Sequence, residues 1–372
     1  MNNTLNIWKA FLAVTLLQFL CAGQCAAEGN FFSSLFKSGE TKPAVANNVA
    51  SSIATLKENM EVRGLDFSPD GKYLAATSTS DSDEVHIWDW QAHSIVRKMK
   101  KGDGSEDPTS TGPLKFSPDG RYLLACHSPA EKDIVIHIWD AQTGALAQGI
   151  AEPKTVDCGA IAFTPDGQSL VRIGSIGRLP NDSIIIYGTK DWKPVWGLRT
   201  LPFYPTTLAI SPDGKFAAVG GNTYGAEIPH QPQIRIVDLT KRTVVRTIDA
   251  FPLENRIRSL AWHPDGKLIA AAAMVGGAFK GPDIVKIFDA GSGRQVLGEE
   301  VEPPEAIDVL RYSPDGKYLV EGPISATIRM WDGQHKTILQ EFHNDALSLA
   351  FSRDGRYLAM GGKRKILVWQ LK

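Results

Sequence analysis

Seven Asp-Gly pairs supply the carboxylates that recur most regularly in the chain and could serve acid–base chemistry. They lie at residues 70–71, 119–120, 166–167, 213–214, 265–266, 315–316 and 354–355. General acid–base catalysis needs a carboxyl group within hydrogen-bond reach of the reacting proton, so two of them would have to share one site. Each pair instead belongs to a separate copy of a repeated phrase, and Asp followed by Gly is typical of a tight turn. We interpret these aspartates as turn residues and expect no catalytic residue among them.

His86 and His137 occupy the same place in two neighbouring copies of the repeat, within "VHIWD" and "IHIWD", and such a pair could bind a metal. Other copies place Arg235, Lys286 and Arg329 in the same register. Because side chains alternate between the two faces of a strand, this register reads as an ordinary polar position. We therefore prefer a structural role for both histidines over metal binding.

The remaining motifs give no sign of a cofactor. His127, His230 and His343 fall in loops of different copies, without the spacing of metal ligands. "GGAFKG" (276–281) is glycine-rich like a phosphate loop, but it precedes an expected strand instead of the helix start that holds phosphate. The sequence also lacks G-x-S-x-G, H-E-x-x-H, G-x-x-x-x-G-K-[ST] and C-x-x-C. We expect neither metal nor cofactor, and a protein that is not an enzyme.

The elements that hold these residues are copies of one phrase, first seen as "FSPDGKYLAA" (67–76). The glycines of its seven copies are 49, 47, 47, 52, 50 and 39 residues apart, a period typical of a propeller or solenoid. Pro presets φ for a turn, Asp suits the next position and Gly accepts the left-handed conformation that follows. Each copy is therefore predicted to be a tight β-hairpin.

Two further strands follow each hairpin in most copies. The third strand reads "VHIWD" (85–89), "IRIVD" (234–238) or "IRMWD" (328–332), and a weaker fourth strand reads "TVVRTI" (243–248) or "TILQEF" (337–342). The last copy ends with its third strand, and "SSIATLKEN" (51–59) matches the missing fourth one. We predict an all-β fold: a seven-bladed β-propeller of four-stranded antiparallel blades, closed by pairing of residues 53–57 with 366–370, which hides an open sheet edge.

The pattern "SPDG(K/R)YLA … (I/V)x(I/M)WD" resembles the WD-repeat β-propellers over residues 51–372. The family's Trp is present as Trp88, Trp139, Trp331 and Trp369, whereas the middle copies have Tyr187, Val237 and Phe288. Gly-His before the first strand is mostly missing, so the family's usual His–Asp–Ser–Trp hydrogen-bond network is not expected here. The resemblance implies the fold and leaves the function open.

The first 27 residues read as a secretory signal peptide. Lys9 precedes an apolar run over residues 10–20, and small residues follow up to Ala27. The run is shorter than the roughly 20 residues of a membrane span. Cys21 and Cys25 lack the small residues usual before a lipidated cysteine. We divide the chain into a signal peptide (1–27), a linker (28–50) and the propeller (51–372), and expect a periplasmic or extracellular protein.

Composition narrows the choice of host and partner. The net charge of −1 creates no basic field for nucleic acid, and the mature chain should have no transmembrane segment. Only Cys126 and Cys158 remain after the signal peptide, so either one disulfide or two buried thiols are possible. So few cysteines in an exported domain are more typical of bacteria than of animals.

The leading function is a non-enzymatic scaffold in the cell envelope, a monomeric propeller that binds unidentified protein partners. The alternatives are a propeller enzyme, either a lactonase or a quinoprotein-like oxidoreductase, and a component similar to the Tol-system propeller. The enzyme would need polar side chains at the channel, whereas the innermost strands read mostly Ala, Gly and Leu, as in "LIAAAA" (268–273). The loops 174–182, 222–233 and 274–283 are long and diverse, and loops commonly carry recognition. The expected contacts within them are Arg178, Tyr224, His230, Phe279 and Lys280.

Overall fold

The computed structural model describes most of the repeated region of the chain. Its described ranges are residues 49–78, 84–100, 111–127, 134–152, 158–174, 183–199, 203–223, 230–253, 255–274, 284–300, 307–322, 327–343 and 346–372. The proposed signal peptide and nearly all of the proposed linker lie outside these ranges.

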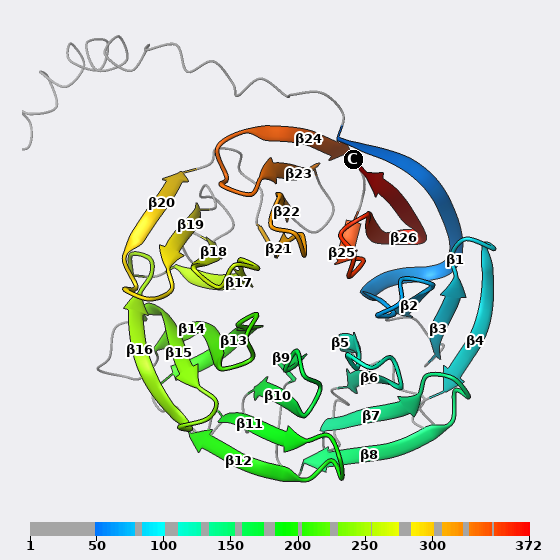
Figure 1. Cartoon of the computed structure of the whole chain (residues 1–372), viewed down its shortest axis with the longest axis horizontal. Helices are drawn as coiled ribbons and strands as arrows, with labels where there is room; N and C mark the ends of the chain where they lie inside the picture. The colour runs from blue at the N-terminus through cyan, green and yellow to red at the C-terminus, as the bar shows by residue number, and fades with distance from the viewer. Residues whose placement is uncertain are drawn as a thin grey trace, which may run out of the picture. The chain divides into compact units, whose positions relative to one another are not determined.

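The described residues form antiparallel sheets and contain no helix. The sheets are arranged around a ring, with the first strand of each repeat nearest the centre (Figure 1). Five sheets have four strands each: β5 (Thr111–Phe116), β6 (Tyr122–His127), β7 (Ile134–Asp140) and β8 (Leu146–Glu152); β9 (Ala160–Phe163), β10 (Ser169–Gly174), β11 (Ser183–Gly188) and β12 (Pro194–Arg199); β13 (Phe203–Ile210), β14 (Phe216–Thr223), β15 (Pro232–Asp238) and β16 (Thr243–Asp249); β17 (Arg256–Trp262), β18 (Leu268–Met274), β19 (Ile284–Asp289) and β20 (Gln295–Glu300); β21 (Val309–Tyr312), β22 (Tyr318–Gly322), β23 (Thr327–Asp332) and β24 (Ile338–His343).

The sixth sheet joins the two ends of the ring. Its order is β25 (Ala346–Phe351), β26 (Tyr357–Leu371), β1 (Ala50–Phe67), β2 (Tyr73–Ser78), β3 (Glu84–Asp89) and β4 (Ser94–Lys100). The first part of β1 pairs with the end of β26, and its last part pairs with β2. Leu56 lies opposite Ile366 and Ala54 opposite Val368, which confirms the predicted closure. Since β1 and β26 each pair through two consecutive segments, this sheet contains the strands of two predicted blades; the count of seven stays a prediction from the repeats.

The repeated phrase forms the turn between the first and second strands, as its chemistry predicts. In the first copy, the Ser68 hydroxyl donates to Asp70 over 2.5 Å and accepts from the Tyr73 amide, while Asp70 also accepts from the Lys72 amide. The glycines of the seven copies have φ between 69° and 78°. In every copy the aspartate accepts the amide two residues later, so these carboxylates are occupied by the turns.

The hydrophobic core lies between neighbouring sheets and buries the second and third strands most completely. In β18, Ala270–Ala273 are fully buried. The expectation that residues 268–273 form an innermost strand is wrong, because β18 lies between β17 and β19 and the first strand β17 is nearest the centre (Figure 1). The alanines allow the sheets to pack closely and say nothing about the chemistry of the channel.

Candidate functional site

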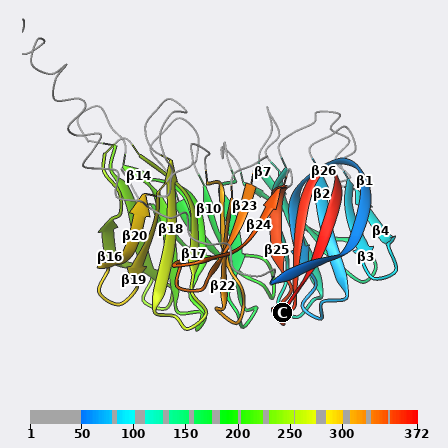
Figure 2. The ribbon, with the colours of Figure 1, turned by 90° about the horizontal axis from the view of Figure 1, so that it is seen from above.

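The two faces of the ring differ in construction. The strands run between a face that carries the Asp-Gly turns, called the turn face below, and an opposite face, called the loop face (Figure 2). Each second strand starts at a turn and therefore ends at the loop face, where the loops 174–182, 222–233 and 274–283 begin. Gly174 pairs with Ser183 and Ala273 with Ile284 at the roots of the first and third of these loops.

Four of the five predicted contact residues, Arg178, Tyr224, Phe279 and Lys280, lie outside the described residues. His230 is described and exposed. It sits at the root of its loop, where two hydrogen bonds join Thr223 and Gln231: one from the Thr223 amide to the Gln231 carbonyl, and one from the Gln231 amide to the Thr223 hydroxyl. The Gln231 side chain donates a further hydrogen bond to the Phe251 carbonyl. The root of this loop is thus fixed to the sheet.

His86 is not an ordinary polar strand residue. Its side chain is 2% exposed, and its Nδ1 lies 3.1 Å from both carboxylate oxygens of Glu58, while its Nε2 lies 3.2 Å from Glu84. The indole of Trp88 donates to Glu58 over 2.6 Å. Burial opposes protonation of His86, but the hydrogen bond and charge of Glu58, together with the hydrogen bond of Glu84, raise its pKa.

Glu58 is the residue that sequence reasoning missed. It lies in β1, next to the segment that pairs with β26, whereas His86 and Trp88 belong to β3. The carboxylate therefore links the closing segment to the first repeat. Ala54, Leu56 and Glu58 alternate along β1 and are all buried, so a carboxylate in line with two inward-facing apolar residues was the available signal.

A second buried histidine–carboxylate pair lies in the repeat before the closing one. His335 Nε2 is 3.1 Å from Glu321, and both side chains are at most 3% exposed. The His335 ring lies 4.2 Å from the ring of Trp331, the tryptophan of the "WD" phrase. In both pairs a buried histidine lies near a tryptophan of the third strand: His335 contacts Trp331, and His86 shares the Glu58 carboxylate with Trp88.

The other predicted polar residues do not converge. His137 is buried and stacks on Trp139 with ring centroids 5.4 Å apart, and the exposed His343 lies 3.2 Å from the Thr327 hydroxyl. Within the ranges given above, no three His, Cys, Asp or Glu side chains are grouped so that they could hold a metal ion.

The strands nearest the ring centre carry charges that the sequence analysis did not assign to them. The position before the last residue of the first strand is Asp66 in β1, Lys115 in β5 and Arg311 in β21, and alanine in the others. Asp66 accepts from the Lys115 ammonium over 3.1 Å and from the Phe116 amide over 2.8 Å. Arg311 is exposed, and its Nη1 donates to the Leu310 carbonyl over 2.9 Å.

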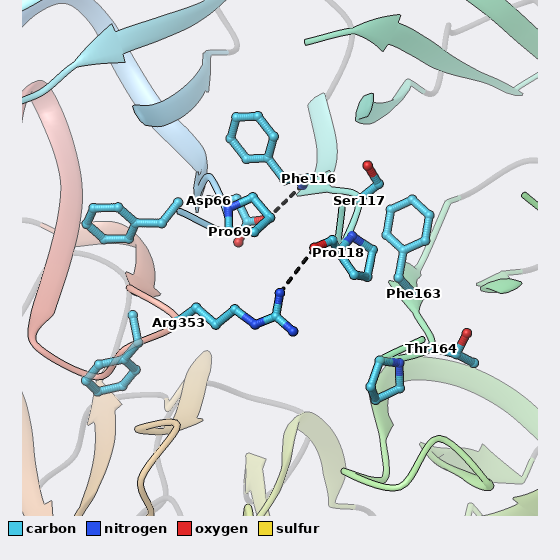
Figure 3. Close-up of a pocket in the computed structure, with 11 residues that line it drawn as sticks. Asp66, Pro69, Phe116, Ser117, Pro118, Phe163, Thr164 and Arg353 are labelled. Atoms are coloured by element: carbon cyan, nitrogen blue, oxygen red, sulfur yellow. Dashed lines mark hydrogen bonds between the residues drawn. The ribbon is translucent and has the colours of Figure 1, made fainter. Parts of the chain in front are cut away.

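A pocket of about 310 Å³ opens at the turn face, beside these strands (Figure 3). Its walls come from the first, second, third and seventh copies of the repeat: Asp66, Phe67, Pro69, Phe116, Ser117, Pro118, Phe163, Thr164, Pro165, Phe351 and Arg353. The lining combines aromatic rings with one cation, Arg353, and one carboxylate, Asp66, and an apolar site with a few polar groups is typical of recognition sites for small groups.

Cys126 and Cys158 are joined by a disulfide with their Cα atoms 6.4 Å apart. Cys126 lies in β6 and Cys158 just before β9, so the bond connects two neighbouring sheets. Of the two alternatives left open by the sequence, the structure has the bonded one.

Comparisons with known proteins agree with this architecture. The family model "WD domain, G-beta repeat" matches residues 50–89, 242–276 and 334–370, so WD40 repeats are found in three places. The chain is also similar to "Protein HIR1" of Yarrowia lipolytica, with 24% identity over 254 residues. The match covers 67% of this chain and 20% of that protein, so the chain spans about a fifth of its relative's length.

Within the described residues, no helix has the length and apolar character to cross a bilayer.

Proposed function

We propose that the chain is a non-enzymatic scaffold that binds protein partners and acts after export, in the cell envelope. WD repeats are typical of protein-interaction scaffolds. Export is supported by the N-terminal sequence, in which Lys9, the apolar run over residues 10–20 and the small residues up to Ala27 follow one another.

One observation carries the choice of the loop face as the partner site. The Asp-Gly turns at the other face are nearly identical, and in six of the seven a Ser or Thr hydroxyl donates to the aspartate, whereas the loops rooted at Thr223, Gly174 and Met274 differ in length and sequence. A rigid sheet that presents variable loops is the usual arrangement for recognition. Aromatic and cationic residues in these loops, such as Tyr224 and Lys280, are of the types enriched at binding hot spots.

The test is an affinity pull-down with residues 28–372 as bait on an envelope fraction, followed by measurement of partner affinity. Tyr224→Ala and Phe279→Ala should each weaken binding by about 1–3 kcal/mol without changing the melting temperature. Val245→Ala is the matched control, since Val245 is exposed on the outer strand β16, away from these loops. Normal binding by both loop variants would show that the loop face is not the partner site.

Activity screens test the alternative that the protein is a lactonase or a quinoprotein-like oxidoreductase. The purified protein should be assayed on lactones and on alcohols with an artificial electron acceptor, under the conditions of the pull-down. We expect no turnover above that of a heat-denatured sample. Turnover that is lost when Asp66 or Arg311 is replaced would overturn the scaffold, because these charges lie on the strands nearest the ring centre.

A further inference from the structure

The seventh copy of the repeated phrase differs from the others at one residue. Arg353 stands where the other copies have proline, although proline favours the turn. Its side chain is exposed and crosses the pocket to the second copy, where Nη1 donates to the Pro118 carbonyl over 3.1 Å (Figure 3). The turn itself keeps the Ser352–Asp354 hydrogen bond of the other copies. Arg353 is therefore not needed for the turn, and its position points to a role in the pocket.

The walls of the pocket are apolar and are produced by the repeat itself. Phe67, Phe116, Phe163 and Phe351 each immediately precede the Ser or Thr of their copy, so equivalent positions bring four phenyl rings to one opening. Phe67 and Phe116 are buried, whereas Phe163 and Phe351 are half-buried. The partly open rings can still lose apolar surface to a ligand, which favours binding.

The charges around the pocket do not cancel. Asp66 is satisfied by the Lys115 ammonium and the Phe116 amide, and this ion pair is neutral as a unit. A guanidinium has five donor hydrogens. Within the described part of the chain, Arg353 uses one of them, on a carbonyl oxygen, and pairs with no carboxylate. One cation with free donors thus remains at the opening.

We propose that this pocket binds a carboxylate carried on an aromatic or other apolar group. The Arg353 guanidinium donates two parallel hydrogen bonds to the carboxylate, and the phenyl rings contact the apolar part of the ligand. A volume of about 310 Å³ is at the small end of ligand pockets, which limits the occupant to one ring or one large side chain. Either a free acid or the C-terminal residue of a protein chain has this chemistry. The site is on the turn face, so it does not depend on the proposed partner site.

The experiment compares a carboxylate with its neutral amide by isothermal titration calorimetry on residues 28–372. The probes are 3-phenylpropionate and 3-phenylpropionamide, and then a tetrapeptide ending in phenylalanine with a free or an amidated C-terminus. A charge-assisted hydrogen bond predicts that each carboxylate form binds about 10-fold or more tightly than its amide. Binding by the free acid assigns a small-molecule ligand, and binding by the peptide alone assigns a protein C-terminus.

Arg353→Pro is the decisive variant, because it restores the residue found in the other copies and should keep the turn folded. It should remove the preference for the carboxylate and leave the melting temperature within a few degrees. Arg356→Gln is the matched control: Arg356 is in the same turn, is exposed and already pairs with Asp354. The proposal is overturned if neither carboxylate binds at millimolar concentration, if acid and amide bind equally, or if Arg353→Pro binds like the unmodified protein.

Discussion

Replacing Glu58 by alanine tests whether the buried carboxylate holds the closing segment to the first repeat. The change leaves the Nδ1 of His86, 3.1 Å from Glu58, and the indole N–H of Trp88, 2.6 Å from it, without their acceptor. His86 and Trp88 are almost fully buried, so a water molecule cannot easily replace the lost carboxylate as their hydrogen-bond acceptor. The segment would then lose its side-chain link to β3 and keep its pairing with β26, the hydrogen bonds between Ala50 and Gln340, and its apolar packing.

The expected cost follows from the type of contact. A buried donor that loses its partner costs about 1–3 kcal/mol, and removing one member of a buried ion pair costs about 3–5 kcal/mol. These two estimates describe the same loss, so we expect about 3–5 kcal/mol in total. At about 2 °C per kcal/mol, the lower end for large domains, the melting temperature should fall by about 6–10 °C.

The pH dependence gives a second, independent signature. Since the pKa of His86 is raised in the folded state, protonated His86 stabilises the fold fully below its unfolded pKa, near 6.5. This stabilisation is lost as the pH rises through the folded-state pKa. The melting temperature of the unmodified protein should therefore fall as the pH rises above about 6.5. Glu58→Gln removes the charge that raises the pKa, so its profile should be flatter over this range.

Differential scanning calorimetry across this pH range measures both effects. Glu61→Ala is the matched control, because Glu61 is in the same strand but its side chain is 39% exposed and pairs with the exposed Arg63. An exposed ion pair of this kind contributes little. The reasoning fails if Glu58→Ala and Glu61→Ala have the same melting temperature. It also fails if the melting temperature of Glu58→Gln falls with pH as steeply as that of the unmodified protein.

Three further predictions follow from the ends of the ring and from its disulfide. Deleting residues 51–57 removes the strand opposite Ile366 and its neighbours; at about 0.5–1.5 kcal/mol per hydrogen bond this should lower the melting temperature and promote aggregation, and an unchanged melting curve would contradict it. Mass spectrometry without reductant should find Cys126 and Cys158 resistant to alkylation, and reduction should cost about 2–4 kcal/mol in chemical denaturation; two alkylatable thiols would exclude the bond. N-terminal sequencing of the exported protein should begin at Glu28, and an uncleaved Met1 would defeat the signal-peptide prediction.

The fold could be predicted from the sequence because its determinants are local and repeated. Six of the seven turns need only a hydroxyl, an aspartate and a glycine within four residues, as in Ser68, Asp70 and Gly71, and the fifth has His263 in place of the hydroxyl. Each third strand repeats one alternating phrase. The closure was predictable for the same reason, since residues 51–59 match a strand that the last copy lacks. The prediction was wrong about which strand of each repeat lies nearest the ring centre. Alanine runs such as 268–273 occur where neighbouring sheets pack tightly, and an apolar sequence alone does not distinguish such a strand from one that lines a channel.

The sites were harder to predict because they combine residues from distant copies. Glu58 and His86 are 28 residues apart and belong to different strands of one sheet, so only the register shows that they meet. Arg353 and Pro118 are 235 residues apart. Yet in both cases the sequence contained a local anomaly: a carboxylate in a buried alternation and an arginine in place of a recurring proline. In a repeat protein each copy is a control for the others, because all must satisfy the same backbone geometry. Where a residue departs from the repeat and its turn or strand stays intact, the backbone geometry does not require that residue. Such positions are where contacts specific to this chain should be sought.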